Sequence, residues 1–391
     1  MSLIDVKNEI KNEFRNIYPN KDKIIDIIHK YVSNTFQMVS DDVFELKKYL
    51  ETQLTKEIKC NYVPLQTKDD YGCDLREIFY GRKGELLEDI EKRQKLINLF
   101  NTNVIGKNKC YHILTDIDDT LFAHRVAGIA GDDYSWKEKI PYPGIKEFYK
   151  QFYETLFDKN KKYTTILSAT PGFAKNSKLK NKSLIDIIGD DFGFIQGEES
   201  KIKQGKSLTN WVYSRFDNND RFEMYGNIKA DRCEQYSTLF PEFDLIFIGD
   251  NGQGDLDAGK KMIDNNCCKY VFIHKIIDKN GNFKDSIIEE KYQNNIFLFE
   301  NYLELAVKFK DLKIFNDYNV GEIKTAIVKD IDIKYKITKP MITLIQSIET
   351  LIQSIETLTD ENHGFPFGGK KTRRRKTKKR KTRRKLKRSN K

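Results

Sequence analysis

The sequence predicts an α/β protein built on a doubly wound, mostly parallel sheet. Through the middle of the chain, short apolar runs alternate with stretches of helical pattern, and acidic or hydroxyl residues directly follow three of the runs. A β-α repetition of this kind forms parallel strands joined by right-handed crossovers. Because parallel strands end at one common edge of the sheet, the polar residues that follow them are expected to meet there.

The predicted elements follow one another in chain order. Strands are expected at 111–115, 163–168, 192–196, 244–249 and 269–274. Helices are expected at 145–157, 184–188, 207–215, 228–239 and 255–263. Residues 1–107 carry apolar residues at helical spacing among many charges, which predicts a helical N-terminal region without recognisable chemistry.

The first polar motif is Asp116-Ile117-Asp118-Asp119-Thr120, which follows the apolar run at 112–115. Side chains alternate in an extended segment, so Asp116 and Asp118 can both reach one site at the end of the strand. This geometry suits phosphoryl transfer, in which one carboxylate attacks phosphorus while the second protonates the leaving oxygen and later activates water. Taken alone, the motif equally fits a solvated loop or a helix cap.

Two further motifs suit the binding of phosphate. Ser168 opens Ser168-Ala169-Thr170-Pro171 at the end of the second predicted strand and offers a hydroxyl to a phosphoryl oxygen; a turn residue is the alternative. Lys229 is expected at the head of the helix at 228–239, where its charge would offset those of nucleophile and phosphate. A solvated surface lysine is the alternative there.

The last motif runs from Gly249 to Asp255 and follows a predicted buried strand. Its glycines let the backbone approach a ligand closely. Asp250 and Asp255 supply hard oxygen ligands of the kind that Mg²⁺ prefers. An ordinary Gly-rich turn is the alternative, but four polar elements in register favour a site.

Together, these motifs resemble those of the haloacid dehalogenase superfamily of phosphatases. The match consists of D-x-D-x-T at 116–120, Ser168, Lys229 and G-D-x-x-x-x-D at 249–255. The resemblance implies Asp116 as nucleophile and Asp118 as general acid and base. It implies phosphate binding by Thr120, Ser168, Ala169 and Lys229. It also implies Mg²⁺ held by Asp116, Asp250, Asp255 and the main-chain carbonyl of Asp118.

Within that superfamily, residues 108–280 look most like the catalytic domain of the actin-patch phosphatidate phosphatases, which implies phosphatidate as the substrate. Members of that family often have an aromatic residue after the stretch that corresponds to 168–171 and a basic cluster around the lysine. In this chain Gly172 follows Pro171, and Asn227-Ile228 precede Lys229. Residues 121–142 are too short for a folded cap domain and can form only a flap. An open site of this kind would admit a large or membrane-borne phosphomonoester, although an accessory domain or partner covering it is the alternative.

The expected organisation has five parts. These are a helical region at 1–107, a catalytic domain at 108–300, an extension of the body at 301–342, a short heptad helix at 343–359, and a hinge with a basic tail at 360–391. Apolar residues at 344–358 alternate four and three apart over two heptads. Packing of this helix onto the body is expected, with oligomerisation as the alternative.

The net charge of +11 is concentrated at the C-terminus. Residues 370–391 hold sixteen Lys or Arg and no acid, so the rest of the chain sums to 11 − 16 = −5. Such a segment cannot bury enough apolar surface to order itself and is expected to be disordered. Binding to an anionic membrane surface or to nucleic acid is expected of it, with a solubilising tail as the alternative.

Composition sets the remaining expectations. The six cysteines show no C-x-x-C pairing, so neither a zinc site nor a disulfide framework is indicated, and a reducing, cytoplasmic location is expected with nuclear or virion-associated ones as alternatives. No apolar run is long enough to predict a transmembrane helix. The Lys-, Ile- and Asn-rich composition and the form of the tail resemble proteins of large DNA viruses. Alternative functions are a phosphatase for nucleic-acid 3′-ends and a catalytically idle scaffold.

Overall fold

The computed structural model of the chain describes residues 2–14, 21–34, 40–57, 79–80, 87–102, 109–123, 133–136, 139–156, 162–168, 182–195, 218–334, 346–351 and 353. The chain divides into a compact unit, Met1–Glu349, and a second unit, Thr350–Lys391. Ala169, the helix predicted at 207–215 and the basic tail at 360–391 lie outside the described residues. The domain boundaries drawn from the sequence stay predictions.

One sheet of six strands organises the first unit, and each neighbouring pair of its strands is parallel. The strand order is β5-β4-β1-β6-β7-β8. The strands are β1 (Cys110–Thr115), β4 (Thr165–Leu167), β5 (Gly193–Ile195), β6 (Phe243–Asp250), β7 (Tyr270–His274) and β8 (Ile296–Phe299). The predicted α/β class with a parallel sheet is therefore confirmed, while β8 is an edge strand that the sequence analysis did not predict.

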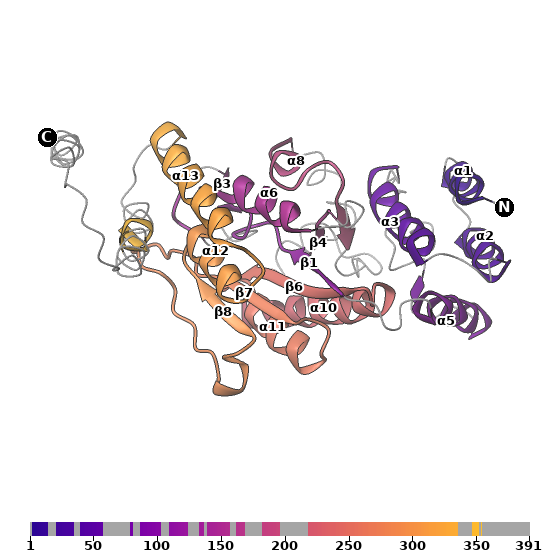
Figure 1. Cartoon of the computed structure of the whole chain (residues 1–391). Helices are drawn as coiled ribbons and strands as arrows, with labels where there is room; N and C mark the ends of the chain where they lie inside the picture. The colour runs from indigo at the N-terminus through magenta and orange to yellow at the C-terminus, as the bar shows by residue number, and fades with distance from the viewer. Residues whose placement is uncertain are drawn as a thin grey trace, which may run out of the picture. The chain divides into compact units, whose positions relative to one another are not determined.

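Helices cover both faces of this sheet (Figure 1). They are α6 (Ile145–Thr155), α8 (Lys182–Ile188), α10 (Asn218–Leu239), α11 (Asp255–Asp264), α12 (Tyr302–Asp311) and α13 (Asp317–Lys334), with a short 3₁₀ helix η2 at Glu290–Tyr292. Strand alternation divides the apolar residues of β7 between the faces. Val271 joins the core under α10 and α11, whereas the ring of Phe272 lies 4.8 Å from that of Phe309 in α12.

The start of α10 differs from the prediction. The helix begins at Asn218 rather than at residue 228, so Lys229 lies in its interior and not at its head. The added first turns contain Gly226, where a Cβ would come within 2.8 Å of the Gly254 carbonyl oxygen. Tertiary packing against the 249–255 loop thus outweighs the weak helix propensity of Gly and Asn.

The N-terminal region is helical where it is described, as predicted. It contains α1 (Leu3–Phe14), α2 (Lys21–Asn34), α3 (Ser40–Glu57) and α5 (Leu87–Thr102). Apolar side chains of these helices share one core with the α10 face of the sheet. For example, the ring of Phe44 in α3 lies 5.6 Å, edge-on, from that of Phe243 in β6.

Two short segments flank the sheet. Strands β2 (Phe122–Ala123) and β3 (Ile140–Pro141) pair antiparallel at the base of the predicted flap. Near the end of the unit, Ile348 is buried, and the Ser347 hydroxyl donates to Glu300 and accepts from Asn301. These described residues of the heptad segment therefore pack on the body, while oligomerisation stays a prediction. Among the helices that the structure describes, none has the length and apolarity needed to cross a bilayer.

Candidate active site

The nucleophile candidate, Asp116, directly follows the central strand β1. Its main-chain N–H donates to the Ile248 carbonyl oxygen at 2.9 Å, which continues the parallel ladder between β1 and β6 by one residue. Asp250 ends β6 two residues later, so the two carboxylates are brought to the same edge of the sheet. Both side chains are buried.

Asp255 joins them because the intervening loop turns back tightly. It is the first residue of α11, behind Gly254, which adopts a left-handed φ of 91°. The loop also needs Gly249, because a Cβ there would overlap the Asp255 carboxylate. The N-terminus of a helix favours a negative charge, so Asp255 is placed where the backbone stabilises it.

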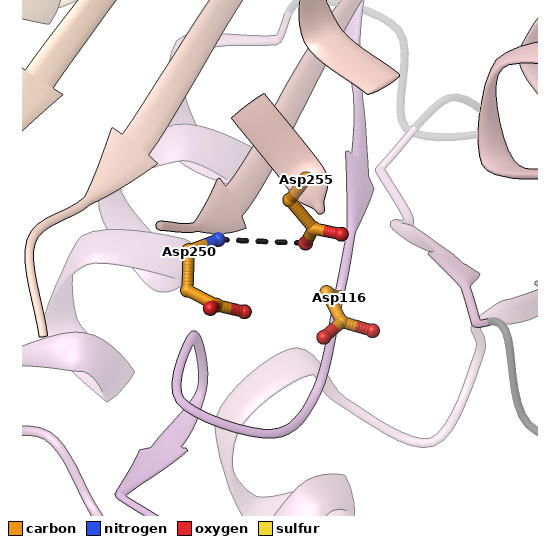
Figure 2. A group of neighbouring side chains, drawn as sticks. All are labelled: Asp116, Asp250 and Asp255. Atoms are coloured by element: carbon orange, nitrogen blue, oxygen red, sulfur yellow. Dashed lines mark hydrogen bonds between the residues drawn. The ribbon is translucent and has the colours of Figure 1, made fainter. Parts of the chain in front are cut away.

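Carboxylate oxygens of Asp116, Asp250 and Asp255 all lie within 4.8 Å of one another. Figure 2 shows the three side chains converging from two strand ends and one helix start, with the Asp250 N–H donating to Asp255 Oδ2 at 3.4 Å. Within the described part of the chain, this is the one cluster of three or more His, Cys, Asp or Glu side chains with such spacing. The sequence motifs predicted all three members.

Lys229 reaches this cluster from α10. Its Nζ lies 3.2 Å from Asp116 Oδ1 and 2.5 Å from Asp255 Oδ1. Burial alone would lower the pKa of Lys229, but the charges of Asp116 and Asp255 hold it above its ordinary value. The ammonium therefore stays charged beside the candidate nucleophile. It reaches this position from the interior of α10, not from the head of a helix.

One ammonium does not balance three carboxylates. With all four groups ionised, the cluster carries −3 + 1 = −2, and the buried Oδ2 atom of Asp250 has no hydrogen-bond partner among the described residues. Burial and the neighbouring Asp255 and Asp116 raise the pKa of Asp250 well above its usual range. Burial also raises the pKa of Asp255 to about 6, even though Lys229 opposes this. A hard divalent cation bound by these oxygens would neutralise the site, so the residues present fit Mg²⁺.

Asp118 lies outside the carboxylate cluster. Its Oδ1 accepts a hydrogen bond from Lys139 Nζ at 2.8 Å, and Lys139 immediately precedes β3 of the flap. The next residue, Asp119, adopts a left-handed φ of 58°, which a short polar side chain tolerates. The Asp119 carbonyl oxygen also lies 2.8 Å from Nδ1 of the buried His274.

The candidate phosphate binders are placed unequally. Ser168 directly follows β4, the neighbour of β1, and is buried at the same edge of the sheet. The Thr120 hydroxyl is buried and makes no hydrogen bond with the described residues. Ala169 lies outside the described residues, so its predicted role is untested.

Sequence reasoning missed Lys139 and His274. Lys139 stands 21 positions after Asp118, and no motif joins them. His274 ends a predicted strand, β7, which was a signal available from the sequence because the neighbouring strand β6 ends in the site residue Asp250.

A scan of protein-family models, a search of curated proteins and a search of solved structures each found no match to this chain.

Proposed function

We propose that the protein is a Mg²⁺-dependent phosphomonoester hydrolase of the haloacid dehalogenase type, acting through an aspartyl-phosphate intermediate. The observation that carries this proposal is the buried cluster of Asp116, Asp250 and Asp255 beside Lys229, in which one carboxylate oxygen has no hydrogen-bond partner within the described part of the chain. A buried unbalanced charge is costly in a purely structural site, so a cationic ligand is the simplest explanation.

In the proposed reaction, the Asp116 carboxylate attacks the phosphorus atom and displaces the alcohol. Lys229 holds the nucleophile by its 3.2 Å contact and offsets charge on the phosphoryl oxygens. When bound by Asp116, Asp250 and Asp255, Mg²⁺ supplies further positive charge for that purpose. Ser168 offers a hydroxyl at the same edge, which suits it to donate to a phosphoryl oxygen, and the buried Thr120 hydroxyl makes no hydrogen bond with the described residues, which leaves it available for the same role.

Asp118 would protonate the leaving oxygen and then take a proton from the attacking water. We expect Asp118→Asn to slow turnover by about 10²- to 10⁴-fold, and to do so more for alkyl than for activated aryl phosphates, because poor leaving groups need the proton most. Equal losses on both substrate types would contradict this role.

The substrate class within the proposal is a lipid phosphate such as phosphatidate. Residues 121–142 are too few for a folded cap domain, and β2 and β3 pair at the two ends of this segment, which favours a phosphate group presented at a surface. The basic tail would draw the protein to an anionic membrane. A phosphatase for 3′-phosphorylated nucleic acid is the alternative substrate assignment, which the same tail favours.

The test compares phosphatidate vesicles, a small aryl phosphate and a 3′-phosphorylated oligonucleotide, each with Mg²⁺ and with excess EDTA. We expect turnover of the aryl phosphate and phosphatidate only with Mg²⁺, and a hydroxylamine-labile phosphate on the chain after acid quenching. Preference for the oligonucleotide would support the alternative substrate. Full activity in EDTA would contradict the Mg²⁺ dependence of the proposed reaction. No turnover of any of the three substrates would contradict the proposed function and leave the idle scaffold.

A further inference from the structure

Three buried cysteines lie together behind the candidate site. Cys233 belongs to α10, while Cys267 and Cys268 connect α11 to β7. The Sγ atom of Cys233 lies 2.9 Å from that of Cys267 and 3.5 Å from that of Cys268. Cys233 is fully buried, whereas Cys267 and Cys268 are 5% and 7% exposed.

The spacing of these sulfur atoms distinguishes a soft-metal site from a disulfide. Thiolates that share a tetrahedral Zn²⁺ at about 2.3 Å stand about 3.8 Å apart, whereas disulfide sulfurs stand about 2.05 Å apart. The observed 2.9 Å is too short for ligands of one metal ion. The three thiols also do not form a cluster with metal-site spacing among the described residues.

We propose that Cys233 and Cys267 form a reversible disulfide, with Cys268 as the exchange partner, and that this cross-link lowers turnover at the neighbouring site. Cys233 is the common sulfur, because it contacts both of the other thiols. Disulfide exchange needs an attacking thiol within reach of the bonded sulfur, and Cys268 meets that condition at 3.5 Å.

The chemistry balances with a peroxide as oxidant. The Cys267 thiolate attacks one oxygen of hydrogen peroxide, which forms a sulfenic acid and releases hydroxide that is protonated to water. The Cys233 thiol then attacks that sulfur, forming the S–S bond and releasing a second water. Hydrogen bonding with Cys233 and Cys268 lowers the pKa of Cys267 below its ordinary value, which favours Cys267 as the attacking thiolate.

The position of the pair couples it to the candidate site. Cys233 lies four residues, one helical turn, after Lys229 on α10. Cys267 follows α11, which begins at Asp255, and Lys229 bonds Asp255 between these two helices. Bond formation closes the sulfurs from 2.9 Å to about 2.05 Å, and we infer that the two elements that carry them shift toward each other by up to that difference. A displacement of that size near reacting groups costs up to about 100-fold in rate.

The test uses the full chain with Cys60→Ser and Cys73→Ser as the parent, because both cysteines lie outside the described residues. The parent is titrated with hydrogen peroxide and mapped with trypsin without reduction. Cleavage after Arg232, Lys261 and Lys269 puts Cys233 in a different peptide from Cys267 and Cys268. We expect a linked peptide pair lighter by two hydrogen atoms, restored to separate peptides by dithiothreitol.

Matched variants assign the bond. Cys233→Ser should abolish the linked pair, Cys268→Ser should keep it, and Cys110→Ser, a half-buried cysteine elsewhere, should leave it unchanged. Loss of the linked pair in Cys268→Ser, or its absence at peroxide levels that oxidise Cys110, would overturn the proposal. A stoichiometric metal ion that Cys233→Ser removes would also overturn it.

The effect on turnover rests on the proposed function. We expect oxidation of the parent to lower turnover about 10-fold or more, with recovery in dithiothreitol and no change in Cys233→Ser. A linked pair without any change in turnover would overturn the regulatory role. The peptide map needs no activity, so failure of the proposed function would be seen separately, as missing turnover in the reduced chain.

Discussion

Two buried polar clusters in this protein are built on opposite principles. At the carboxyl edge of the sheet, Asp116, Asp250 and Asp255 share one ammonium, and one of their oxygens has no hydrogen-bond partner among the residues that the structure describes. Beneath α3, by contrast, both oxygens of buried Glu51 accept hydrogen bonds from hydroxyls. The donors are Thr165 at 2.6 Å, Tyr163 at 3.0 Å and Tyr236 at 3.2 Å.

A second group under α3 is satisfied in the same way. Lys47 Nζ lies 2.6 Å from the Glu242 carboxylate and donates to the Leu239 carbonyl oxygen at 2.8 Å. Among the described residues, Glu51, Lys47 and Glu242 therefore each have a partner of opposite sign or a set of hydrogen-bonding dipoles. Under the proposed function, the edge cluster serves chemistry, whereas the α3 cluster docks the N-terminal helices. The predictions below test that division.

The largest effect is expected for Asp116→Asn. A neutral amide cannot attack phosphorus, so turnover and phosphoenzyme should fall by a factor on the order of 10³ or more. Stability should hold or rise, because the change removes one of three crowded carboxylates. Steady-state rates and urea unfolding measure the two effects.

Asp244→Asn is the matched control for that variant. Asp244 lies at the opposite end of β6 and pairs with Lys269 on the surface, so its loss should leave turnover within about twofold. Turnover of Asp116→Asn within a few-fold of wild type would remove Asp116 from the mechanism.

The next effect concerns stability and should be independent of Mg²⁺. Lys47→Met leaves the Glu242 carboxylate without its cation, and the lysine side chain is only 1% exposed, so we expect a loss of about 3–5 kcal/mol in urea unfolding. Lys7→Met breaks the more exposed pair with Glu45 and should cost less than about 1 kcal/mol. Equal effects of the two variants would contradict a buried anchor under α3.

The fold could be predicted because its signals are local. Each of β1, β4, β5, β6 and β7 is an apolar run that ends within two residues of its expected position. Strand β8 was missed because Ile296–Phe299 is short and lies at the edge of the sheet, where half its residues are only partly buried. The first turns of α10 were missed because their Asn and Gly residues form a helix only against the rest of the fold.

The residues of the site also divide into those that local sequence signals predict and those that only packing determines. Asp116, Asp250 and Asp255 were predictable because residues after parallel strands share one edge, which is a property of topology. The partners Lys139 for Asp118, Glu51 for Thr165 and Cys267 for Cys233 are set by packing between distant segments. No spacing rule in one sequence reports such contacts.

The α3 cluster also predicts a dependence of stability on pH. Burial raises the pKa of Glu51 from 4.5 to about 7, against the hydrogen bonds from Thr165, Tyr163 and Tyr236. The folded state therefore holds the Glu51 carboxyl proton more tightly than the unfolded state does. The contribution of protonated Glu51 to the free energy of unfolding is complete below pH 4.5 and is lost as pH rises through about 7. The shift corresponds to about 3 kcal/mol.

Glu51→Gln removes this titration while keeping an acceptor for the hydroxyls. The free energy of unfolding of the variant, relative to that of wild type, should rise by up to about 3 kcal/mol between pH 4.5 and pH 8. Urea unfolding at each pH measures this difference. A constant difference between the two proteins across that range would mean that Glu51 is not a buried titrating group.

The smallest effect, and the sharpest test of the comparison, is expected for Asp250→Asn. This change keeps the shape of the side chain but removes one charge from the edge cluster, so the Mg²⁺ concentration for half-maximal turnover should rise about 10- to 100-fold. Without Mg²⁺, the variant should be at least as stable as wild type, because the buried Oδ2 atom of Asp250 has no hydrogen-bond partner in the described ranges. Thermal unfolding with and without Mg²⁺ gives a readout independent of activity. Mg²⁺ should stabilise wild type and Glu51→Gln equally, and Asp250→Asn much less. Equal stabilisation of all three proteins would place the cation elsewhere, and the edge cluster would then have to be explained, like the α3 cluster, as part of the architecture.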